Sequence, residues 1–305
     1  MLKVFVVILN WNRAEDTIAC LDSVEKLAAK DIDLKILLVD NASEVDDLEE
    51  IKKYTGNRKN ITLIENEKNF GFAEGNNVGI RHALANGADY VMILNNDTLV
   101  DIDLVNSLVL RSESDKRIGA ISPKIYFAPG FEFHKDRYQQ KDLGKVIWYA
   151  GGEIDWNNVY GTTRGVDRVD EGDYNETIET DFATGTCLLL RASALNEIGL
   201  FDSKYFMYFE DTDLSQRFKK DGWKVIYEPK GIVWHKVAQS SGIGSELNDY
   251  FITRNRLIFG MRWAPLRAKI ALLRESLRFL FTGRKWQKIG TIDYYLGKFG
   301  KGSWK

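Results

Sequence analysis

The chain contains 305 residues, 44% of which are hydrophobic, and its formal net charge is −2. This length fits one large domain or one domain with an appendage. Its two cysteines, Cys20 and Cys187, are too few for a disulfide framework and favour a reducing cytosol. No apolar stretch reaches the ~18 residues of a membrane-spanning helix, and Met1–Leu9 is too short for the apolar part of a signal peptide. We therefore expect a cytoplasmic protein.

The charge is distributed unevenly along the chain. Residues 254–305 contain 13 Lys and Arg residues against two acidic residues, so this segment carries +11 and the remainder −13. An acidic body with a basic, aromatic tail indicates that the two parts have different partners.

Strand and helix patterns alternate through the first 95 residues. Continuous apolar runs predict buried strands, whereas apolar residues three and four positions apart predict helices. In chain order we expect strand Val4–Leu9, helix Asp16–Leu27, strand Leu34–Val39, helix Asp47–Tyr54, strand Ile61–Ile64, helix Gly75–Leu84 and strand Tyr90–Leu94. This order predicts an α/β fold with a mostly parallel, Rossmann-like sheet flanked by helices.

The pattern breaks between Phe127 and Thr180, where we expect short strands and long loops that contact an acceptor or form a lid. Regular structure then returns. We expect strand Cys187–Leu190, helix Ser193–Ile198, helix Asp213–Lys220, strand Lys224–Tyr227 stopped by Pro229, and a mainly helical segment from Leu247 onward.

Polar residues follow the predicted parallel strands. Asn10 and Asn12 come after the first strand, Asp40 after the second, and Asn95-Asn96-Asp97 after the fourth. Open α/β sheets bind ligands at the edge where such strand ends meet. Capping and turn formation explain Asn10 and Asp40 equally well, but three polar residues in a row favour a site. Asp97 would then bind Mg²⁺ or Mn²⁺ together with diphosphate oxygens.

A glycine- and asparagine-rich segment, Asn69–Asn77, precedes a predicted helix. Its glycines indicate backbone with positive φ. Its amide groups would lie near a helix N-terminus, where phosphate or ribose oxygens bind.

A second acidic segment follows the aromatic run Tyr205–Phe209. Thr212 or Asp213 would cap the next helix, but capping does not explain the adjacent pair Glu210-Asp211. Apolar surroundings raise the pKa of a carboxyl group and make it a better base, so Asp211 is the candidate general base. His235 ends a later apolar run and is a candidate metal ligand only in the company of Asp97.

The tail combines apolar residues at helical spacing with basic residues. These are Leu266, Ile270, Leu273, Leu277 and Leu280, interleaved with Arg267, Lys269, Arg274, Arg278, Arg284 and Lys285. One interpretation is a helix packed on the body. The other is an interfacial helix over residues 262–288 that holds the protein on the anionic inner face of the cell membrane. We expect no nucleic-acid partner, because the body is acidic and carries no signature of a nucleic-acid-binding module.

Six ordered segments together resemble the inverting family 2 glycosyltransferases, and most closely the branch containing many rhamnosyltransferases of bacterial and archaeal surface polysaccharides. The resemblance runs from Leu2 to His235, and the pattern around Arg254-Asn255-Arg256 is also similar. The segments are Val7–Asn12, Val39–Ser43, Asn69–Asn77, Leu94–Thr98, Thr184-Gly185 and Phe206–Arg217.

This resemblance implies a GT-A fold, a nucleotide-diphospho-sugar donor (dTDP- or UDP-linked, with dTDP-rhamnose as one candidate), a divalent metal and transfer to a saccharide or lipid-linked saccharide. It implies that Asp40 contacts the nucleoside, that Asn95-Asn96-Asp97 replaces the family's DxD motif, and that Asp97 and His235 bind metal. Asp211, beside Glu210, matches the catalytic base. The other expected donor-site residues are Asn10, Asn12, Asn41, Asn69, Gly71 and Asn76, and those on the acceptor or donor-sugar side are Thr184, Gly185 and Trp148.

The resemblance also divides the chain. We expect a catalytic domain over residues 1–245, with a nucleotide-sugar half (1–125) and an acceptor half (126–245), followed by a basic amphipathic helical tail (246–305). Two rivals remain. A sugar-nucleotidyltransferase would need a glycine-rich, basic turn after the first strand, where this chain has Asn10-Trp11-Asn12-Arg13. A non-catalytic lipid- or saccharide-binding protein would not need Asp211.

Overall fold

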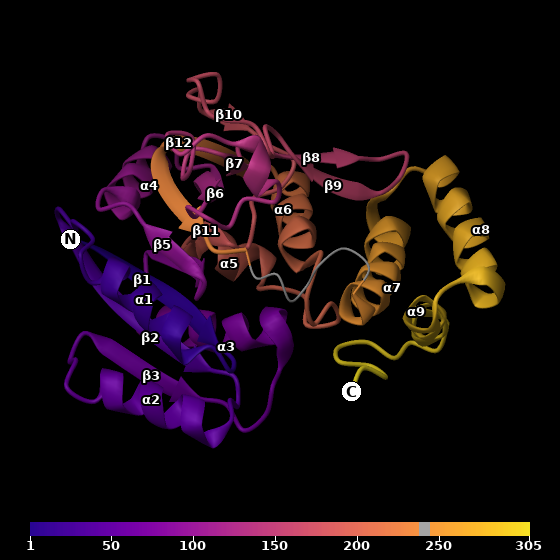
Figure 1. Cartoon of the computed structure of the whole chain (residues 1–305), viewed down its shortest axis with the longest axis horizontal. Helices are drawn as coiled ribbons and strands as arrows, with labels where there is room; N and C mark the ends of the chain where they lie inside the picture. Colours follow the sequence, from indigo (N-terminus) through magenta and orange to yellow (C-terminus); the bar gives the residue numbers. More distant parts are fainter. Residues whose placement is uncertain (238–244) are drawn as a thin grey trace.

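The computed structural model describes residues 1–237 and 245–305 (Figure 1). The strands are β1 (Leu2–Asn10), β2 (Ile32–Asp40), β3 (Ile61–Glu65), β4 (Tyr90–Asn95), β5 (Thr98–Val100), β6 (Ile118–Phe127), β7 (Ile147–Tyr149), β8 (Gly152–Asp155), β9 (Tyr160–Thr163), β10 (Ile178–Glu179), β11 (Cys187–Arg191) and β12 (Lys224–His235). The helices are α1 (Ala14–Val24), α2 (Val45–Thr55), α3 (Gly71–Ala85), α4 (Leu104–Glu113), a 3-10 turn (Lys135–Arg137), α5 (Ala192–Ile198), α6 (Glu210–Lys220), α7 (Glu246–Trp263), α8 (Leu266–Thr282) and α9 (Lys285–Tyr295).

The main sheet has the strand order β10-β12-β6-β11-β4-β1-β2-β3, with β5 paired to β12 and β7 paired to β6. Strands β3, β2, β1 and β4 run parallel, and β6 and β12 form a second parallel pair. Strand β11 joins the two halves by pairing antiparallel with both β4 and β6. The predicted α/β fold with a mostly parallel sheet is confirmed.

Helices cover both faces of this sheet, and β1 shows why. Val4, Val6 and Ile8 belong to a core shared with α1 and α4, whereas Phe5 and Val7 belong to a core shared with α3, α5 and α6. Since successive side chains of a strand point to opposite faces, burial on both faces requires a continuous apolar run.

Helices α3 and α6 begin well before their predicted first residues. Helix α3 begins at Gly71 rather than Gly75, because the later glycines serve close packing rather than a turn: a Cβ on Gly79 would lie 2.4 Å from Val7 Cγ1 of β1. Helix α6 begins at Glu210, so the acids form its first turn, and its N-cap is Phe209 in left-handed conformation. The prediction that Thr212 or Asp213 caps this helix is therefore wrong.

Strand β12 continues to His235, so the prediction that Pro229 ends it is also wrong. Its register with β6 shifts between Glu228 and Ile232, and this irregularity removes the proline from the ladder. The continuation pairs with β5 and sets His235 opposite Thr98, next to Asp97. The missed half of the strand is thus the part that carries the histidine to the sheet edge.

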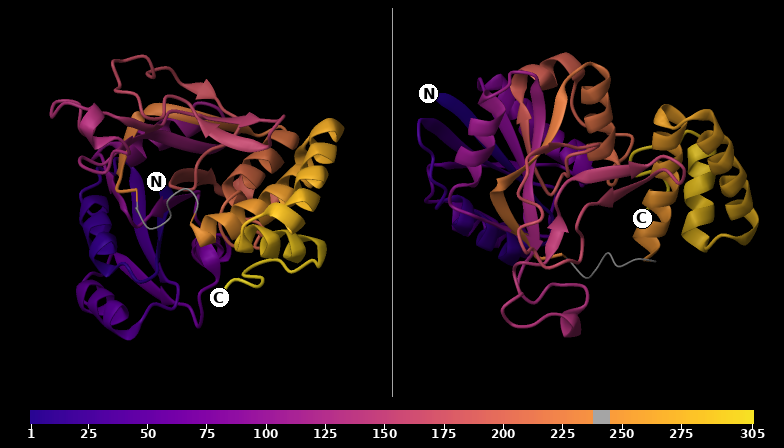
Figure 2. Two further views of the ribbon diagram at one scale, coloured as in Figure 1. Left: turned by 45° about the vertical axis from the view of Figure 1, so that its right-hand side comes forward. Right: turned by 90° about the horizontal axis from the view of Figure 1, so that it is seen from above.

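The C-terminal segment is helical, as predicted, but the expected helix over residues 262–288 is interrupted at Pro265 and at Gly283. Figure 2 shows α7, α8 and α9 grouped beside the sheet domain in both views. Helix α7 packs against the body: Tyr250 and Phe251 are buried in a cluster with Phe206. Only part of the tail therefore faces solvent as an amphipathic surface.

Candidate active site

The ends of β1 and β2 form one hydrogen-bonded unit at the sheet edge. Asn10 lies opposite Asp40 in the ladder, and its Nδ2 donates to Asp40 Oδ1 at 2.9 Å and to Asp47 Oδ2 at 2.8 Å. Ser43 donates to the same carboxylate through its backbone N (3.0 Å) and its Oγ (2.6 Å). Asp40 thus forms the turn that follows its strand, and its carboxylate is already bonded inside the protein.

The predicted asparagines tie the neighbouring loops to this unit. Asn12 Oδ1 accepts from Glu44 N at 2.7 Å. Asn41 Nδ2 donates to Asn69 Oδ1 at 3.0 Å and to Gly71 O at 3.2 Å, which joins the end of β2 to the start of α3. These bonds fix the loops after β1 and β2 to each other and to the start of α3, and the role of the asparagines in donor binding stays a prediction.

Asn76 lies within α3, rather than in a loop before it. Its Nδ2 donates to Phe72 O at 2.9 Å, and its Oδ1 is buried with no hydrogen-bond partner in the described part of the chain. Its role in donor binding stays a prediction.

The segment after β4 is attached to the same edge. Asn95 pairs with Leu9, and its backbone N donates to Thr186 O at 2.9 Å. Asn96 Nδ2 donates to Thr17 Oγ1 at 2.9 Å. Asp97 follows these two asparagines and lies between the end of β4 and the start of β5.

Asp97 and His235 meet at this point and offer two metal donors. Asp97 Oδ1 lies 3.2 Å from His235 Nε2, without hydrogen-bond geometry, and has no hydrogen-bond partner among the described residues. Two ligands at right angles, each about 2.1 Å from one octahedral ion, would be about 3 Å apart, so the pair fits a divalent cation. Since residues 1–237 and 245–305 offer no group of three or more His, Cys, Asp or Glu ligands, diphosphate oxygens or water would have to complete the shell.

Trp148 lies beside this pair. Strand β7 carries its ring edge-to-face against His235, with centroids 4.7 Å apart. The indole ring therefore limits the positions that the imidazole can adopt. Its predicted role on the acceptor or donor-sugar side stays a prediction.

Asp211 lies in the first turn of α6 and bonds to the segment that precedes β11. Gly185 N donates to Asp211 Oδ2 at 2.8 Å, and a Cβ on Gly185 would lie 3.6 Å from that oxygen. Thr184, which precedes this glycine, is buried. Thr186, which follows it, accepts a hydrogen bond from Asn95 N through its backbone oxygen. The 184–186 turn thus connects the carboxylate of α6 with the segment that leads to Asp97.

The three acids at the start of α6 differ in environment. Asp213 is fully buried and accepts from Arg217 Nε (2.9 Å), Arg262 Nη1 (3.1 Å) and Trp263 Nε1 (2.8 Å), so it is a fixed structural ion. Glu210 is 5% exposed, and its Oε2 has no partner among the described residues. Asp211 is partly exposed. Of the three, only Asp211 combines hydrogen bonds that fix it with access to a ligand.

Burial raises the pKa of both carboxyl groups in the Glu210-Asp211 pair. Loss of hydration raises the pKa of Glu210 well above its ordinary value, with a further contribution from the neighbouring Asp211 carboxylate. Burial also raises the pKa of Asp211, and the amide donors Gly185 N and Thr212 N oppose that rise. A raised pKa makes a carboxylate a stronger proton acceptor.

Several residues that build this site were not predicted from the sequence. Thr17 and Asp47 lie on α1 and α2, and Arg262 and Trp263 lie at the end of α7. Their partners are far away in the chain, so no local pattern indicates them. Ser43 had a weak signal, because it ends the predicted segment Val39–Ser43.

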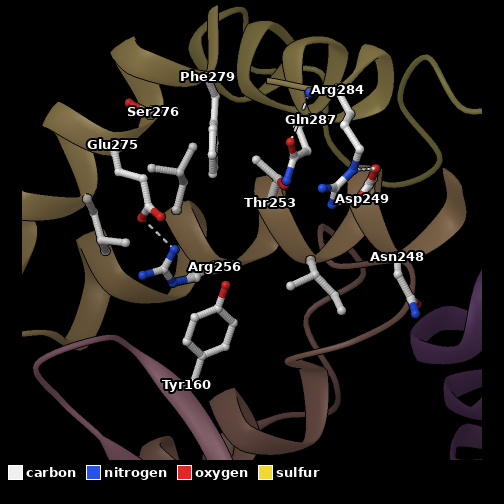
Figure 3. Close-up of a pocket in the computed structure, with 13 residues that line it drawn as sticks. Tyr160, Asn248, Asp249, Thr253, Arg256, Glu275, Ser276, Phe279, Arg284 and Gln287 are labelled. Carbon is white, nitrogen blue, oxygen red and sulfur yellow. Dashed lines mark hydrogen bonds and ion pairs between the residues drawn. The ribbon is translucent and has the colours of Figure 1, made fainter. Parts of the chain in front are cut away.

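A separate hollow of about 260 Å³ lies between α7 and the pair α8 and α9, and it contains none of these residues. Figure 3 shows two ion pairs in its wall, Arg256–Glu275 and Arg284–Asp249. These ion pairs link α7 with α8 and with the residue before α9, so the hollow is part of the packing between the C-terminal helices.

Comparison with known proteins identifies the family. A protein-family model described as "Glycosyl transferase family 2" matches residues 5–199. The chain belongs to glycosyltransferase family 2. Over 154 residues it is 29% identical to the N-acetylglucosaminyl-diphospho-decaprenol L-rhamnosyltransferase of Mycobacterium tuberculosis, covering 50% of this chain and 49% of that protein. It is 22% identical over 217 residues to the low-salt glycan biosynthesis hexosyltransferase Agl10 of Haloferax volcanii, covering 71% of this chain and 61% of that protein.

Solved structures agree on the fold. The mannosyltransferase PcManGT from Pyrobaculum calidifontis, in complex with GDP-Man and Mn²⁺, superposes with a TM-score of 0.57 at 16% identity, over 96% of this chain and 74% of that one. The predicted family and the GT-A fold are confirmed, and the similarity to the mycobacterial rhamnosyltransferase supports the predicted rhamnosyltransferase-like branch. The chain spans about half the length of the mycobacterial relative. No helix within the described ranges has the length and apolar character needed to cross a bilayer.

The buried Glu210 makes stability depend on pH. Its folded pKa is raised, so the folded chain keeps a proton that the unfolded chain releases above about pH 4.3, and stability falls as pH rises from there toward the raised pKa. Glu210→Gln removes this titration. We expect it to raise the melting temperature at about pH 8, by about 2 °C for each kcal/mol recovered, and to flatten the decline between about pH 5 and 8.

Melting curves of both proteins across that pH range measure the effect. Glu153→Gln, at an exposed position, is the matched control and should follow the wild type. Parallel curves for Glu210→Gln and the wild type would contradict this account of Glu210.

Proposed function

We propose that this protein is a metal-dependent, inverting glycosyltransferase that moves a sugar from a nucleotide-diphospho-sugar to a hydroxyl of a saccharide or lipid-linked saccharide in cell-surface polysaccharide synthesis. A dTDP- or UDP-sugar is the donor, with dTDP-rhamnose as first candidate. The mycobacterial relative, an N-acetylglucosaminyl-diphospho-decaprenol L-rhamnosyltransferase, supports rhamnose as the transferred sugar and a lipid-linked acceptor. Family membership favours this function over a sugar-nucleotidyltransferase.

The proposed mechanism is a single displacement. Asp211 accepts the proton of the acceptor hydroxyl, and the oxygen attacks the anomeric carbon from the face opposite the diphosphate. The bond from that carbon to the diphosphate oxygen breaks, and the configuration inverts. The observation that most supports this role is the hydrogen bond from Gly185 N to Asp211 Oδ2, which holds a partly exposed carboxylate near the strand ends.

Asp97 and His235 are the residues that would hold a divalent cation. Their 3.2 Å separation supports this assignment, as does the lack of a hydrogen-bond partner for Asp97 Oδ1 within residues 1–237 and 245–305. A bound cation would supply positive charge that stabilises the departing diphosphate. Asn10, Asn41 and Asn69 would line the floor under the nucleotide through the loops that they connect.

The first test addresses the base. We expect Asp211→Asn to lower transfer by at least ~10²-fold while donor binding survives, because the amide cannot accept the proton. Nucleotide-sugars are first screened by melting-temperature shift with metal present, and the stabilising donor is used to measure transfer. Asp221→Asn, exposed at the other end of α6, is the control and should keep wild-type turnover. Turnover retained in Asp211→Asn would show that Asp211 is not the base, whereas a wild type that binds a donor but transfers no sugar would favour a non-catalytic binding protein.

The second test addresses the metal. We expect a chelator to abolish transfer, and Asp97→Ala to be inactive even with added Mn²⁺, because one of two protein donors is lost. The shift in melting temperature that Mn²⁺ produces in the presence of the donor should also disappear in Asp97→Ala. Asp103→Ala, an exposed acid nearby, is the control. Full activity in excess chelator would show that no metal is needed.

The exposed face of α8 supports peripheral attachment to an anionic membrane. Leu266 and Phe281 are 73% and 80% exposed, and Ile270 and Leu277 lie on the same face between them. Exposed arginines flank this stripe, namely Arg267, Arg274 and Arg278. An apolar stripe beside basic residues is the pattern of an interfacial helix, in which each cation adds about 1 kcal/mol near anionic lipid.

The third test addresses this surface. Replacing Leu277 and Phe281 together by Ser should weaken binding to phosphatidylserine-containing vesicles by tenfold or more, on the order of what two buried apolar side chains contribute. Vesicle co-sedimentation of the full chain measures it. Leu110→Ser, equally exposed on α4, is the control and should bind like the wild type. Equal binding by all three proteins would leave packing on the body as the only role of α8.

A further inference from the structure

The backbone of residues 204–209, here called the aromatic turn, adopts an unusual conformation just before α6. Phe206, Tyr208 and Phe209 have φ values of 64°, 68° and 73°. Residues with bulky side chains rarely adopt this left-handed region. Such backbone persists only where its surroundings hold it in place. The contacts of the turn therefore decide where the following residues lie.

Helix α7 supplies the hydrogen bonds that hold the turn. Asn255 Nδ2 lies 2.8 Å from Tyr205 O, 2.7 Å from Met207 O and 3.0 Å from Tyr208 O. Arg254 Nη2 donates to Tyr205 O at 3.0 Å. Both side chains are fully buried, so water cannot replace these donors.

The two donors are themselves fixed from behind. Arg254 Nε donates to Asn255 Oδ1 at 3.0 Å, and Arg254 Nη1 donates to Tyr250 OH at 3.2 Å. That hydroxyl in turn donates to Asp293 of α9, whose carboxylate also accepts from Ser303 N at 2.8 Å. The C-terminal helices thus form a rigid support behind the turn.

The turn leads directly to the proposed base and also contacts the donor side. Glu210 and Asp211 follow it without an intervening residue. Phe206 O accepts from Ala73 N at 3.0 Å, and the Phe206 ring lies so close to Gly71 that a Cβ there would come within 2.5 Å. A shift of the turn would therefore move Asp211 relative to the start of α3.

We propose that Asn255, supported by Arg254, is a positioning residue that fixes the Asp211 carboxylate through the aromatic turn. This inference rests on the proposed function, in which Asp211 is the base. Proton transfer needs the base within hydrogen-bond reach of the acceptor hydroxyl, and a misplacement of about 1 Å costs about 10²-fold in rate. Asn255 bonds to the turn and not to the strand-end asparagines, so kcat should fall while the KM for the donor stays.

The variant that isolates this effect is Asn255→Asp. It keeps the shape of the side chain and the oxygen that accepts from Arg254, but a carboxylate replaces the amide that donates to three carbonyls. Arg254→Lys is the milder second variant, because it keeps the charge and removes the guanidinium donor to Tyr205 O. The matched control is Arg256→Met: Arg256 is the next residue of α7, is nearly as buried, and bonds instead to Asn158 O and Glu275.

Two measurements on the full chain decide the matter. We expect Asn255→Asp to lower kcat by about 10²-fold with the donor KM within about threefold, and to accelerate amide exchange over residues 206–212 by about tenfold or more. Arg256→Met should change neither. If Asn255→Asp does not fold, Arg254→Lys is expected to show the same two changes to a smaller degree.

The proposal is overturned if kcat is unchanged in the folded variant, or if kcat falls without faster exchange in residues 206–212 than in Arg256→Met. The exchange measurement needs no substrate. If the wild type transfers no sugar but Asn255→Asp still exchanges faster over residues 206–212, the proposed function is wrong and Asn255 still fixes the aromatic turn. If the wild type is active but exchange in Asn255→Asp is unchanged, the proposed function stands and the role of Asn255 is wrong.

Discussion

The in-register parallel pairing of β1 with β2 and β4 is the constraint on which the site depends. It sets Asn10 opposite Asp40 and Asn95 opposite Leu9, so polar strand ends gather at one edge. A carboxylate buried at this edge has to be hydrogen-bonded, and Asn10 and Ser43 satisfy Asp40. Strand β11 then brings the 184–186 turn to Asn95, and the extended β12 brings His235 to Asp97. The contacts of Thr186 with Asn95 and of His235 with Asp97 thus depend on this edge.

The first turn of α6 shows how neighbouring acids acquire different chemistry. Asp213 accepts hydrogen bonds from Arg217 and Arg262, whereas Glu210 is buried and its Oε2 has no partner in the described ranges. Asp211 receives amide donors and keeps part of its surface open. Because ionisation depends on hydration and hydrogen bonding rather than on sequence neighbours, three acids within four residues can be a structural anion, a buried acid and a candidate base.

The sequence predicted those features that follow from local patterns. Burial on both faces produced the apolar runs of β1, β2 and β4. The polar residues after β4 indicated Asp97 and the acids after the aromatic run indicated Asp211, and the metal and base roles of these two residues stay predictions. It missed the continuation of β12 beyond Pro229, because an irregular register can carry a proline through a strand. It also missed contacts between residues distant in the chain, such as Asn96 with Thr17, 79 positions apart, and Asn255 with the aromatic turn. Such pairs leave no periodic signal, since only the folded topology brings them together.

The charge of the tail has a different meaning once its helices are resolved. Arg254 and Arg256 of α7 are buried, and their guanidinium groups donate to Tyr205 O and Asn158 O inside the protein. Gly260 of the same helix allows α8 to approach closely, since a Cβ there would lie 2.2 Å from Leu272. The outer face of α8 is left with the exposed stripe and its arginines. The net charge of the tail therefore overstates the charge available to an anionic surface, because the buried arginines of α7 form hydrogen bonds inside the protein. The exposed arginines of α8 are the ones left to contact such a surface.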